Sequence, residues 1–446
     1  MKDERLIEIC PSKRQLEIQK LGFYAFFHFT INTFTGKEWG DGQESPSLFN
    51  PKEMDADQWV RAIKAAGMKG AILTCKHHDG FCLWPSRYTE HSVKASPYKN
   101  GKGDIVREVS DACKRHGIKF GVYLSPWDRN QETYGQGKAY NDYFVNQLTE
   151  LLTQYGELFC VWFDGACGEG KNGKKQDYDW ERYYQIIRKY QPNACISVTG
   201  PDVRWCGNEA GDTRASEWSV VPAALSMAEK IAEASQQEDN TAFREKTISS
   251  MEQDLGSRER LKDEEKLIWY PAEVDVSIRP GWFYHKEEDT QVRSLENLVD
   301  IYEKSVGGNA MLLLNIPPMP NGKLNEADVA RLEELGTFLR KKYEKNLAKD
   351  AHIDIEEKKT QMKITAKWDA LTDVSAIVLK EDIRFSQRVE KYRVFVQGEA
   401  GLELVYEGTT IGFRKIISIN KRKTNTVIVE INDFRVKPVL FDIEIY

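Results

Sequence analysis

The 446-residue sequence contains no long apolar run, no excess of positive charge and no closely paired cysteines. Its apolar runs fall far short of the roughly 20 residues that a membrane-spanning helix needs, so we predict no membrane span. Asp and Glu outnumber Lys and Arg by 69 to 63. This balance argues against a nucleic-acid partner, because proteins that follow phosphates concentrate positive charge. A small neutral substrate fits the composition better.

The eight cysteines are scattered without a CxxC motif, and Cys75, Cys160 and Cys195 fall within strand-like runs. This spacing favours small buried side chains over a zinc site or a disulfide framework. The first residues lack the apolar segment of a signal peptide. We therefore expect a cytoplasmic protein, or a periplasmic or secreted one if a leader has been removed. No motif implies a cofactor.

Strand-like apolar runs alternate with helical patterns through residues 1–348. The expected strands are 23–29, 70–75, 118–124, 158–163, 194–198, 273–278 and 311–316. Helical patterns are expected near 55–66, 104–116, 138–155, 180–190, 294–306 and 325–345. Such alternation is typical of parallel βα units, and so many units favour a (β/α)₈-like TIM barrel.

Two further segments depart from this alternation. Residues 223–266 are highly charged and helix-prone, and we expect them to leave the barrel and present a solvated face. Residues 349–446 contain short runs with a period of two, such as 392–396 and 426–431. That pattern predicts a C-terminal antiparallel β-sandwich, most simply packed against the barrel.

Polar and aromatic side chains stand at the ends of the expected barrel strands. Asp164 follows the buried run LFCVWF, His28 ends the first strand, and His77 and His78 follow the second. Parallel strands bring their carboxyl ends to one face, where barrel active sites are built. Asp164 alone could cap the next loop, but several strands delivering such groups to one mouth indicate a site. Tyr123 and Trp127 belong to the same set.

A sugar substrate suits these residue types. Neutral imidazoles can exchange hydrogen bonds with hydroxyl groups, and Trp39, Trp127 and Trp282 offer apolar platforms for the carbon face of a sugar. A metal site is the alternative that His77 and His78 suggest. Adjacent residues of a strand point to opposite sides, and neither HxH nor HExxH occurs. We therefore predict no metal.

Glycoside hydrolysis needs two carboxyl groups, one of which attacks or activates water while the other protonates the leaving oxygen. Asp164 is the first candidate. Glu209, in a glycine-bounded loop after the fifth strand, is the second, and Glu217 is its competitor. In an enzyme that retains anomeric configuration, we expect the two groups about 5–5.5 Å apart.

Five motifs taken together and in order resemble the retaining α-L-fucosidases over essentially the whole chain. They are His28-Phe29, EWGDG at 38–42, KHHDGF at 76–81, GVYLSPW at 121–127 and VWFDG at 161–165. The resemblance implies a barrel followed by a β-sandwich and a fucosylated oligosaccharide or glycoconjugate as substrate. It leaves the oligomeric state open.

The resemblance also implies roles for individual residues. Asp164 corresponds to the nucleophile, and the fucose ring is expected to lie among His28, Glu38, Trp39, His77, His78 and Trp282. Residues 208–211 (NEAG) and 276–282 (VSIRPGW) resemble the branch that acts on α1,3- and α1,4-linked fucose. On that basis the acid/base role falls to Glu209, with Glu217 in reserve.

Two other functions remain open at this stage. A non-catalytic glycan-binding protein would keep the histidines and tryptophans but could dispense with the carboxylates. A metal-dependent hydrolase would lose activity with EDTA. The presence of both Asp164 and Glu209 disfavours the glycan-binding protein. Incubation with an aryl α-L-fucoside would distinguish such a protein from an enzyme.

Overall fold

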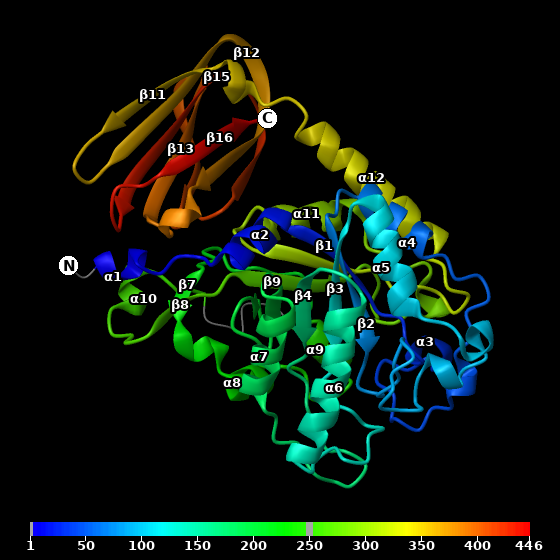
Figure 1. Ribbon diagram of the computed structural model, residues 1–446. Helices are drawn as coiled ribbons and strands as arrows, with labels where there is room; N and C mark the ends of the chain where they lie inside the picture. Colours follow the sequence, from blue (N-terminus) through cyan, green and yellow to red (C-terminus); the bar gives the residue numbers. More distant parts are fainter. Residues whose placement is uncertain (1–2, 247–252) are drawn as a thin grey trace.

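The computed structural model describes residues 3–246 and 253–446, which form a barrel surrounded by helices and a separate antiparallel β domain (Figure 1). The β domain, yellow to red in Figure 1, contains the C-terminus, and the N-terminal helix α1 (Glu4–Ile7) lies beside it. The predicted (β/α)₈-like barrel with a C-terminal antiparallel domain is therefore confirmed.

Eight parallel strands form the barrel in the order β5-β4-β3-β2-β1-β10-β9-β6. They are β1 (Phe23–Phe27), β2 (Gly70–Lys76), β3 (Lys119–Leu124), β4 (Leu158–Phe163), β5 (Cys195–Val198), β6 (Arg204–Trp205), β9 (Ala272–Ser277) and β10 (Met311–Asn315). The two ends of the sheet, β5 and β6, are joined by the isolated bridge Ser197–Val203. The sequence patterns predict seven of these strands and miss β6, because two residues are too short to show a period.

Helices on the outside connect the strands (Figure 1). The longer ones are α2 (Lys13–Leu21), α4 (Ala56–Ala65), α5 (Ile105–His116), α6 (Lys138–Gln154), α7 (Trp180–Tyr190), α11 (Leu295–Ser305) and α12 (Glu326–Lys342). In α5 the side chain of Asp104 caps the first turn by accepting from the Arg107 N–H, and Gly117 ends the helix with φ of 69°. None of the described helices is long and apolar enough to cross a membrane.

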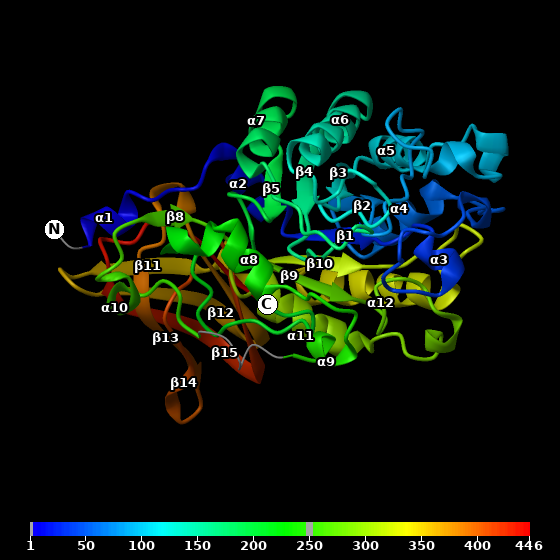
Figure 2. The same cartoon turned by 90° about the horizontal axis from the view of Figure 1, so that it is seen from below.

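The charged segment after β5 forms short elements instead of a regular βα unit. They are β7 (Val220–Pro222), α8 (Ala228–Ala234), α9 (Thr241–Arg244), α10 (Arg258–Leu261) and β8 (Leu267–Trp269). A separate short helix, α3 (Asn32–Thr35), follows β1. Strands β7 and β8 pair with each other outside the barrel. Figure 2 views the barrel from the side where α8 and α9 lie.

The C-terminal domain is a six-stranded antiparallel sheet. Its strands are β11 (His352–Glu357), β12 (Met362–Glu381), β13 (Val389–Gly398), β14 (Gly401–Gly408), β15 (Lys415–Phe434) and β16 (Leu440–Ile445). The 20-residue strands β12 and β15 pair along both halves, with a register shift between Lys367 and Thr372. Residues from both halves, such as Ile364 and Ile377, share one core, so the sheet packs on itself as a sandwich. We propose the domain boundary near Lys349, between α12 and β11.

The two parts of the chain contact each other through polar side chains and backbone pairing. Gln387 Oε1, in the C-terminal domain, accepts from the Ser219 N–H at 2.6 Å. Arg258, in α10, donates to both oxygens of Asp433. Backbone bridging between Gly308 and Lys415 adds a further link. The C-terminal domain therefore supports both the barrel and the segment around α10.

The interior of the barrel is aromatic, and Glu273 is a fully buried carboxyl group within it. Tyr24, Phe26, Tyr123 and Trp162 belong to a core cluster inside the strands. Glu273 accepts hydrogen bonds from the Tyr24 hydroxyl and from Trp162 Nε1. Because both donors are held by their own strands, this carboxyl group fixes the orientation of the aromatic floor.

A buried ion pair connects β2 with the loop after β3. Lys76 Nζ lies 2.9 Å from Asp128 Oδ2, and both side chains are fully buried. Gln147 Oε1 accepts a second hydrogen bond from Lys76 at 3.0 Å. Asp128 in turn accepts from the backbone N–H groups of Asn130 and Gln131, so the pair fixes the loop beside the barrel mouth.

We predict that Lys76→Met lowers the free energy of unfolding by about 3–5 kcal/mol, because it leaves the Asp128 carboxylate buried without its cation. Lys138→Met is the matched control, since Lys138 is 85% exposed in its pair with Asp142 and exposed pairs contribute about 0–1 kcal/mol. Urea unfolding of both variants measures the difference. Equal losses would contradict the importance of the buried pair.

Candidate active site

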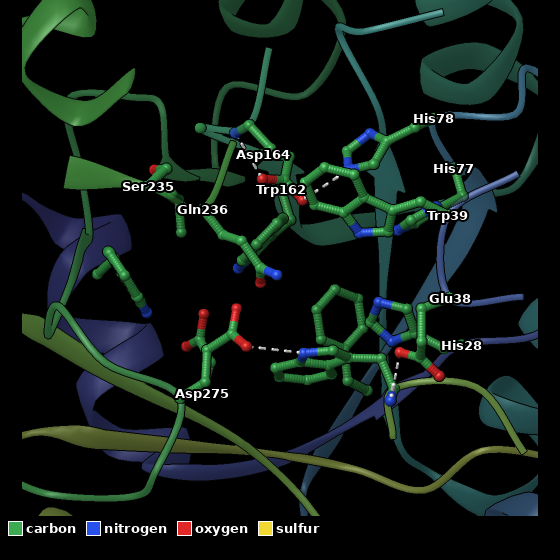
Figure 3. A pocket seen from close by; sticks show the side chains of 17 residues that line it. His28, Glu38, Trp39, His77, His78, Trp162, Asp164, Ser235, Gln236 and Asp275 are labelled. Atoms are coloured by element: carbon green, nitrogen blue, oxygen red, sulfur yellow. Dashed lines mark hydrogen bonds and ion pairs between the residues drawn. The ribbon is translucent and has the colours of Figure 1, made fainter. Parts of the chain in front are cut away.

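A cavity opens at the carboxyl ends of the barrel strands, where predicted and unpredicted residues meet (Figure 3). Its lining includes Phe26, His28, Glu38, Trp39, His77, His78, Trp162, Asp164, Val198, Trp205, Glu209, Ser235, Gln236, Asp275 and Trp282. These residues come from or follow β1, β2, β4, β5, β6 and β9 and the segment around α8. Parallel strand direction explains the convergence, because all strand ends lie at the same face.

Asp164 follows β4 directly and points into the cavity (Figure 3). The Tyr123 hydroxyl donates to its Oδ2 at 3.0 Å, and the Ala166 N–H donates to its Oδ1 at 2.8 Å. Burial raises the pKa of Asp164, and these two donors act in the opposite direction. The donors therefore favour the ionised form and fix the direction of the carboxylate.

His28 is a neutral imidazole whose tautomer follows from its neighbours. Asn315 Nδ2 donates to the carbonyl of Trp282 at 2.8 Å, so the amide oxygen of Asn315 faces His28 Nδ1 at 2.9 Å. Nδ1 must then carry the proton, and Nε2 is an acceptor. Burial lowers the pKa of His28 to about 4. The imidazole consequently accepts a hydrogen bond from any hydroxyl that reaches its Nε2.

His78 is in a similar state. The Ser125 hydroxyl donates to the carbonyl of Trp127 at 2.7 Å and so accepts from His78 Nδ1, also at 2.7 Å. The free Nε2 lies 3.9 Å from Asp164 Oδ2. Burial lowers the pKa of His78 to about 3. His78 Nε2 and Asp164 Oδ2 are therefore two neighbouring acceptors without a proton between them. A hydroxyl group of a ligand can lie between them and donate its proton to one of the two.

His77 completes the group of three imidazoles. Its ring stacks on Tyr123 at 5.8 Å with an angle of 14°. Burial lowers its pKa well below the ordinary value. Nδ1 of His77 is buried and has no hydrogen-bond partner within the described part of the chain. All three histidines are thus neutral.

Glu38 is a buried carboxylate that ties together distant segments. It accepts from the N–H groups of Trp282 at 2.9 Å and Phe283 at 3.2 Å and from His285 Nε2 at 2.6 Å. Arg244 Nη2 lies 3.4 Å away. Burial raises the pKa of Glu38, but these donors and the arginine charge bring it below its usual value. Glu38 is therefore ionised.

Glu209 lies in the loop after β6 and has one strong donor. Trp282 Nε1 donates to its Oε2 at 3.0 Å. Burial raises the pKa of Glu209 to about 7, the Trp282 hydrogen bond opposes this shift, and the charge of Asp164 adds to it. A carboxyl group of this pKa can give up a proton and take one back near neutral pH.

The chain is similar to known proteins over nearly its whole length. The family model for alpha-L-fucosidase matches residues 13–344. Alpha-L-fucosidase 1 of Arabidopsis thaliana is 35% identical over 467 residues, which covers 98% of this chain and 87% of the relative. The chain belongs to the alpha-L-fucosidase family. It is therefore a glycoside hydrolase.

Solved structures of this family share the fold. A glycoside hydrolase 29 family member from an unknown rumen bacterium is 39% identical with a TM-score of 0.84, covering 98% of this chain and 77% of that one. A fucosidase from Ruminococcus gnavus, solved in complex with fucose, is 29% identical with a TM-score of 0.85, covering 98% and 95%.

The structure brings most of the predicted residues of this fucosidase-family chain to one cavity. Eight of them line it: His28, Glu38, Trp39, His77, His78, Asp164, Glu209 and Trp282. Tyr123 and Trp127 are absent from the lining and lie behind it, against Asp164 and His78 respectively. Among the described residues, no three His, Cys, Asp or Glu side chains converge as a metal site requires.

Glu217, the reserve candidate, lies outside this cavity. It pairs with Arg204 and, at 3.4 Å, with Arg214, and it is 1% exposed. The Asn309 side chain donates to its carbonyl at 2.8 Å. Its carboxylate therefore belongs to a buried ion-pair cluster, in which Arg214 also donates to the carbonyl of Cys206 at 3.0 Å.

Sequence reasoning missed several groups at the site, among them Asp275 and Arg244. Asp275 lines the cavity and has a buried oxygen, Oδ1, without a hydrogen-bond partner among the described residues. Its spacing of two from Glu273 within one strand could have placed both on the inner face. The expected solvated face of 223–266 is wrong for Arg244, which is 16% exposed beside Glu38. No local pattern signals that contact.

The segment after β7 also reaches the nucleophile candidate. Ser235 and Gln236 line the cavity (Figure 3). A side chain added at Gly165 would lie 2.0 Å from Ser235 Oγ. The glycine after Asp164 therefore permits the segment around α8 to pack over the end of β4.

We predict that His78 makes the native state lose stability as the pH falls. Its pKa is about 3 in the folded chain against an ordinary 6.5, so the unfolded chain alone takes up this proton between those values. From pH 7 to pH 5, wild type should lose about 2 kcal/mol more than His78→Gln. Urea unfolding at both pH values measures it.

Buried acids with a raised pKa, such as Asp79 and Glu209, change the stability in the opposite direction as the pH falls. Their contribution is the same in wild type and His78→Gln, so it cancels in the difference between the two. His352→Gln, at an exposed histidine of β11, is the control and should follow wild type. A His78→Gln curve parallel to that of wild type would contradict the prediction.

Proposed function

We propose that this chain is a retaining exo-α-L-fucosidase that releases terminal α-L-fucosyl groups from fucosylated glycans by double displacement. The observation that carries the proposal is a pair of unlike carboxyl groups facing one cavity. Asp164 has two donors that favour its ionised form, whereas the pKa of Glu209 is raised to about 7. Such a division suits one nucleophile and one acid.

In the first step, a carboxylate oxygen of Asp164 forms a bond to the anomeric carbon of fucose. The bond from that carbon to the glycosidic oxygen breaks, and its electron pair stays on the oxygen. Glu209 donates its proton to this oxygen, so the rest of the glycan leaves as a neutral alcohol.

In the second step, the ionised Glu209 takes a proton from water as the water oxygen attacks the anomeric carbon. The bond to Asp164 breaks, and its electrons return to the carboxylate. Two inversions give net retention, and both acids regain their starting protonation states. The Trp282 N–H, at 3.0 Å from Glu209, stabilises its carboxylate between the steps.

The neutral histidines provide recognition of hydroxyl groups. His28 and His78 each present an acceptor nitrogen, and the ionised Glu38 adds carboxylate oxygens. Phe26, Trp162 and Trp282 supply apolar surface in the same cavity. A deoxy sugar has hydroxyl groups along one edge and a methyl group elsewhere, and it suits this mixture. The fucose-bound relative from Ruminococcus gnavus supports the same class of ligand.

For the linkage, we propose α1,3- and α1,4-bound fucose. Support comes from residues 208–211 and 276–282, which resemble that branch of the family. In the structure these two segments meet through the hydrogen bond from Trp282 to Glu209. The likeness therefore concerns the part of the site nearest the departing glycan.

We predict that variants of the two acids lose activity in different ways. Asp164→Ala should lose all measurable hydrolysis. Glu209→Ala should lose about 10²–10⁴-fold in kcat on oligosaccharides but far less on 4-nitrophenyl α-L-fucoside, whose leaving group needs little protonation. Wild-type kcat should also fall as the pH rises through about 7, where Glu209 loses its proton.

Azide distinguishes Glu209 from Glu217. In Glu209→Ala, azide should attack the fucosyl-enzyme in place of water and yield α-fucosyl azide with net retention, detectable by NMR. Glu217→Gln is the comparison and should form none. Azide product from the Glu217 variant alone would transfer the acid/base role to Glu217, and normal turnover by Asp164→Ala would reject the nucleophile.

We predict a kcat/KM at least about tenfold higher for branched α1,3- and α1,4-linked fucose than for terminal α1,2-linked fucose, a difference of one good hydrogen bond in the transition state. Matched oligosaccharides with fucose release measured by chromatography give the ratio. Equal or reversed rates would reject the linkage while leaving fucosidase activity intact.

A further inference from the structure

A second cavity of about 170 Å³ adjoins the first one and shares two of its residues, Glu209 and Trp282. Its lining also contains Arg244, Arg279 and Arg293. A space of this size holds several water molecules. A ligand group of a few heavy atoms therefore fits.

The linings of the two cavities show on which side of the proposed fucose site the second cavity lies. Asp164 and the three histidines line only the first cavity, whereas Glu209 borders both. In the proposed mechanism Glu209 protonates the leaving oxygen, so the departing glycan lies on its side of the fucosyl group. The second cavity is consequently placed for the leaving glycan.

Two of its arginines have buried N–H groups that nothing in the described chain accepts. Arg279 Nε donates to Asp328 and Nη1 to Asp289, but Nη2 is buried without a partner. Arg244 Nη2 pairs with Asp239 and Glu38, but Nε is buried without a partner. Unpaired buried donors are costly, and a ligand acceptor removes that cost.

Arg293 adds a cation that lacks a carboxylate partner within the described residues. Its Nε donates to the carbonyl of Ser277 at 2.7 Å and its Nη1 to Asn297 Oδ1 at 2.9 Å. Both acceptors are neutral. Glu245 is the remaining acid of the lining, since Glu209 begins the reaction protonated. Because Arg244 and Arg279 already pair with carboxylates, Arg293 is the guanidinium group of this lining whose charge no carboxylate of the described residues neutralises.

We propose that this cavity, lined by Arg244, Arg279 and Arg293 beyond Glu209, binds an anionic group of the leaving glycan, a carboxylate or a sulfate ester. The proposal rests on the proposed function, because it uses Glu209 to define the leaving-group side. Planar guanidinium groups bind both anions through paired N–H donors. The enzyme therefore prefers fucosylated glycans that carry such a charge near the fucose.

Kinetics on three matched oligosaccharides test the proposal. They share one fucosylated core that is neutral, carries a sugar carboxylate such as a sialic or uronic acid, or carries a sulfate ester. For wild type, kcat/KM should be about tenfold or more higher for at least one anionic form, as one charge-assisted hydrogen bond provides. The anion that gives the preference identifies the ligand.

Arg293→Gln should bring the ratio of anionic to neutral kcat/KM close to one. This variant avoids Arg244, which contacts Glu38, and Arg279, which is fully buried with Asp328. Arg61→Gln is the matched control, because Arg61 lies on α4 at 58% side-chain exposure, and it should keep the wild-type ratio. Arg293→Lys retains the positive charge but lacks the paired N–H donors of the guanidinium group. Its ratio should lie between those of wild type and Arg293→Gln.

A wild-type ratio at or below one for both anions would overturn the subsite even if Arg293→Gln does not fold. Equal losses on neutral and anionic substrates in Arg293→Gln would also overturn it. In either case, hydrolysis of 4-nitrophenyl α-L-fucoside would still support the proposed function. Absence of hydrolysis on every fucoside would instead reject the proposed function itself.

Discussion

The site depends on one buried carboxylate, Glu38, which accepts hydrogen bonds or pairs with cations from two separate parts of the chain. Trp282, Phe283 and His285 follow β9, and Arg244 ends α9. A desolvated carboxylate keeps its charge only while these donors remain in place. Glu38 therefore fixes the loop of Trp282, and the indole of Trp282 in turn holds Glu209.

The same network separates the two catalytic candidates electrostatically. Asp164 receives a hydroxyl and a backbone N–H, whereas Glu209 receives a single indole N–H and lies near the charge of Asp164. Asp275, whose pKa burial and Glu273 raise well above its usual range, is neutral beside them. One charge in a crowded set of acids is easier to hold than three. Before a substrate binds, each of these three carboxyl groups therefore has a defined protonation state.

Much of the barrel could be predicted because its signals are local. Strands such as β4 appear as continuous apolar runs, and helices such as α5 show an N-cap, a buried face and a terminal glycine. The strand-end positions of His28, His77 and Asp164 follow from parallel direction alone. Glu209 and Glu217 were both candidates from their loop positions, and the choice of Glu209 relied on the family resemblance, since a loop position carries no periodicity.

Other features could not be predicted because they depend on contacts between residues far apart in sequence. Arg244 and Glu38 are separated by 206 positions along the chain, and charge alone made the segment around α9 look solvated. Strand β6 has two residues and exists because Arg204 and Trp205 pair with β9. Asp275 could have been found by strand alternation, but its burial without a partner is a property of the packed barrel.

The seam between β5 and β6 explains why the two acids come from different kinds of element. Val198, at the end of β5, has φ of 66°, which a β-branched residue adopts only at a cost of about 1–2 kcal/mol. Its N–H bonds to the carbonyl of Val203 at 2.9 Å, so the chain turns sharply there. Asp164, by contrast, follows β4, which pairs on both sides with β3 and β5. In the proposed mechanism, the nucleophile Asp164 needs a fixed direction toward one carbon, whereas the acid/base Glu209 must reach first a leaving oxygen and then a water. Placing Glu209 on the loop beyond the weakly paired seam, with Trp282 as its restraint, fits that difference.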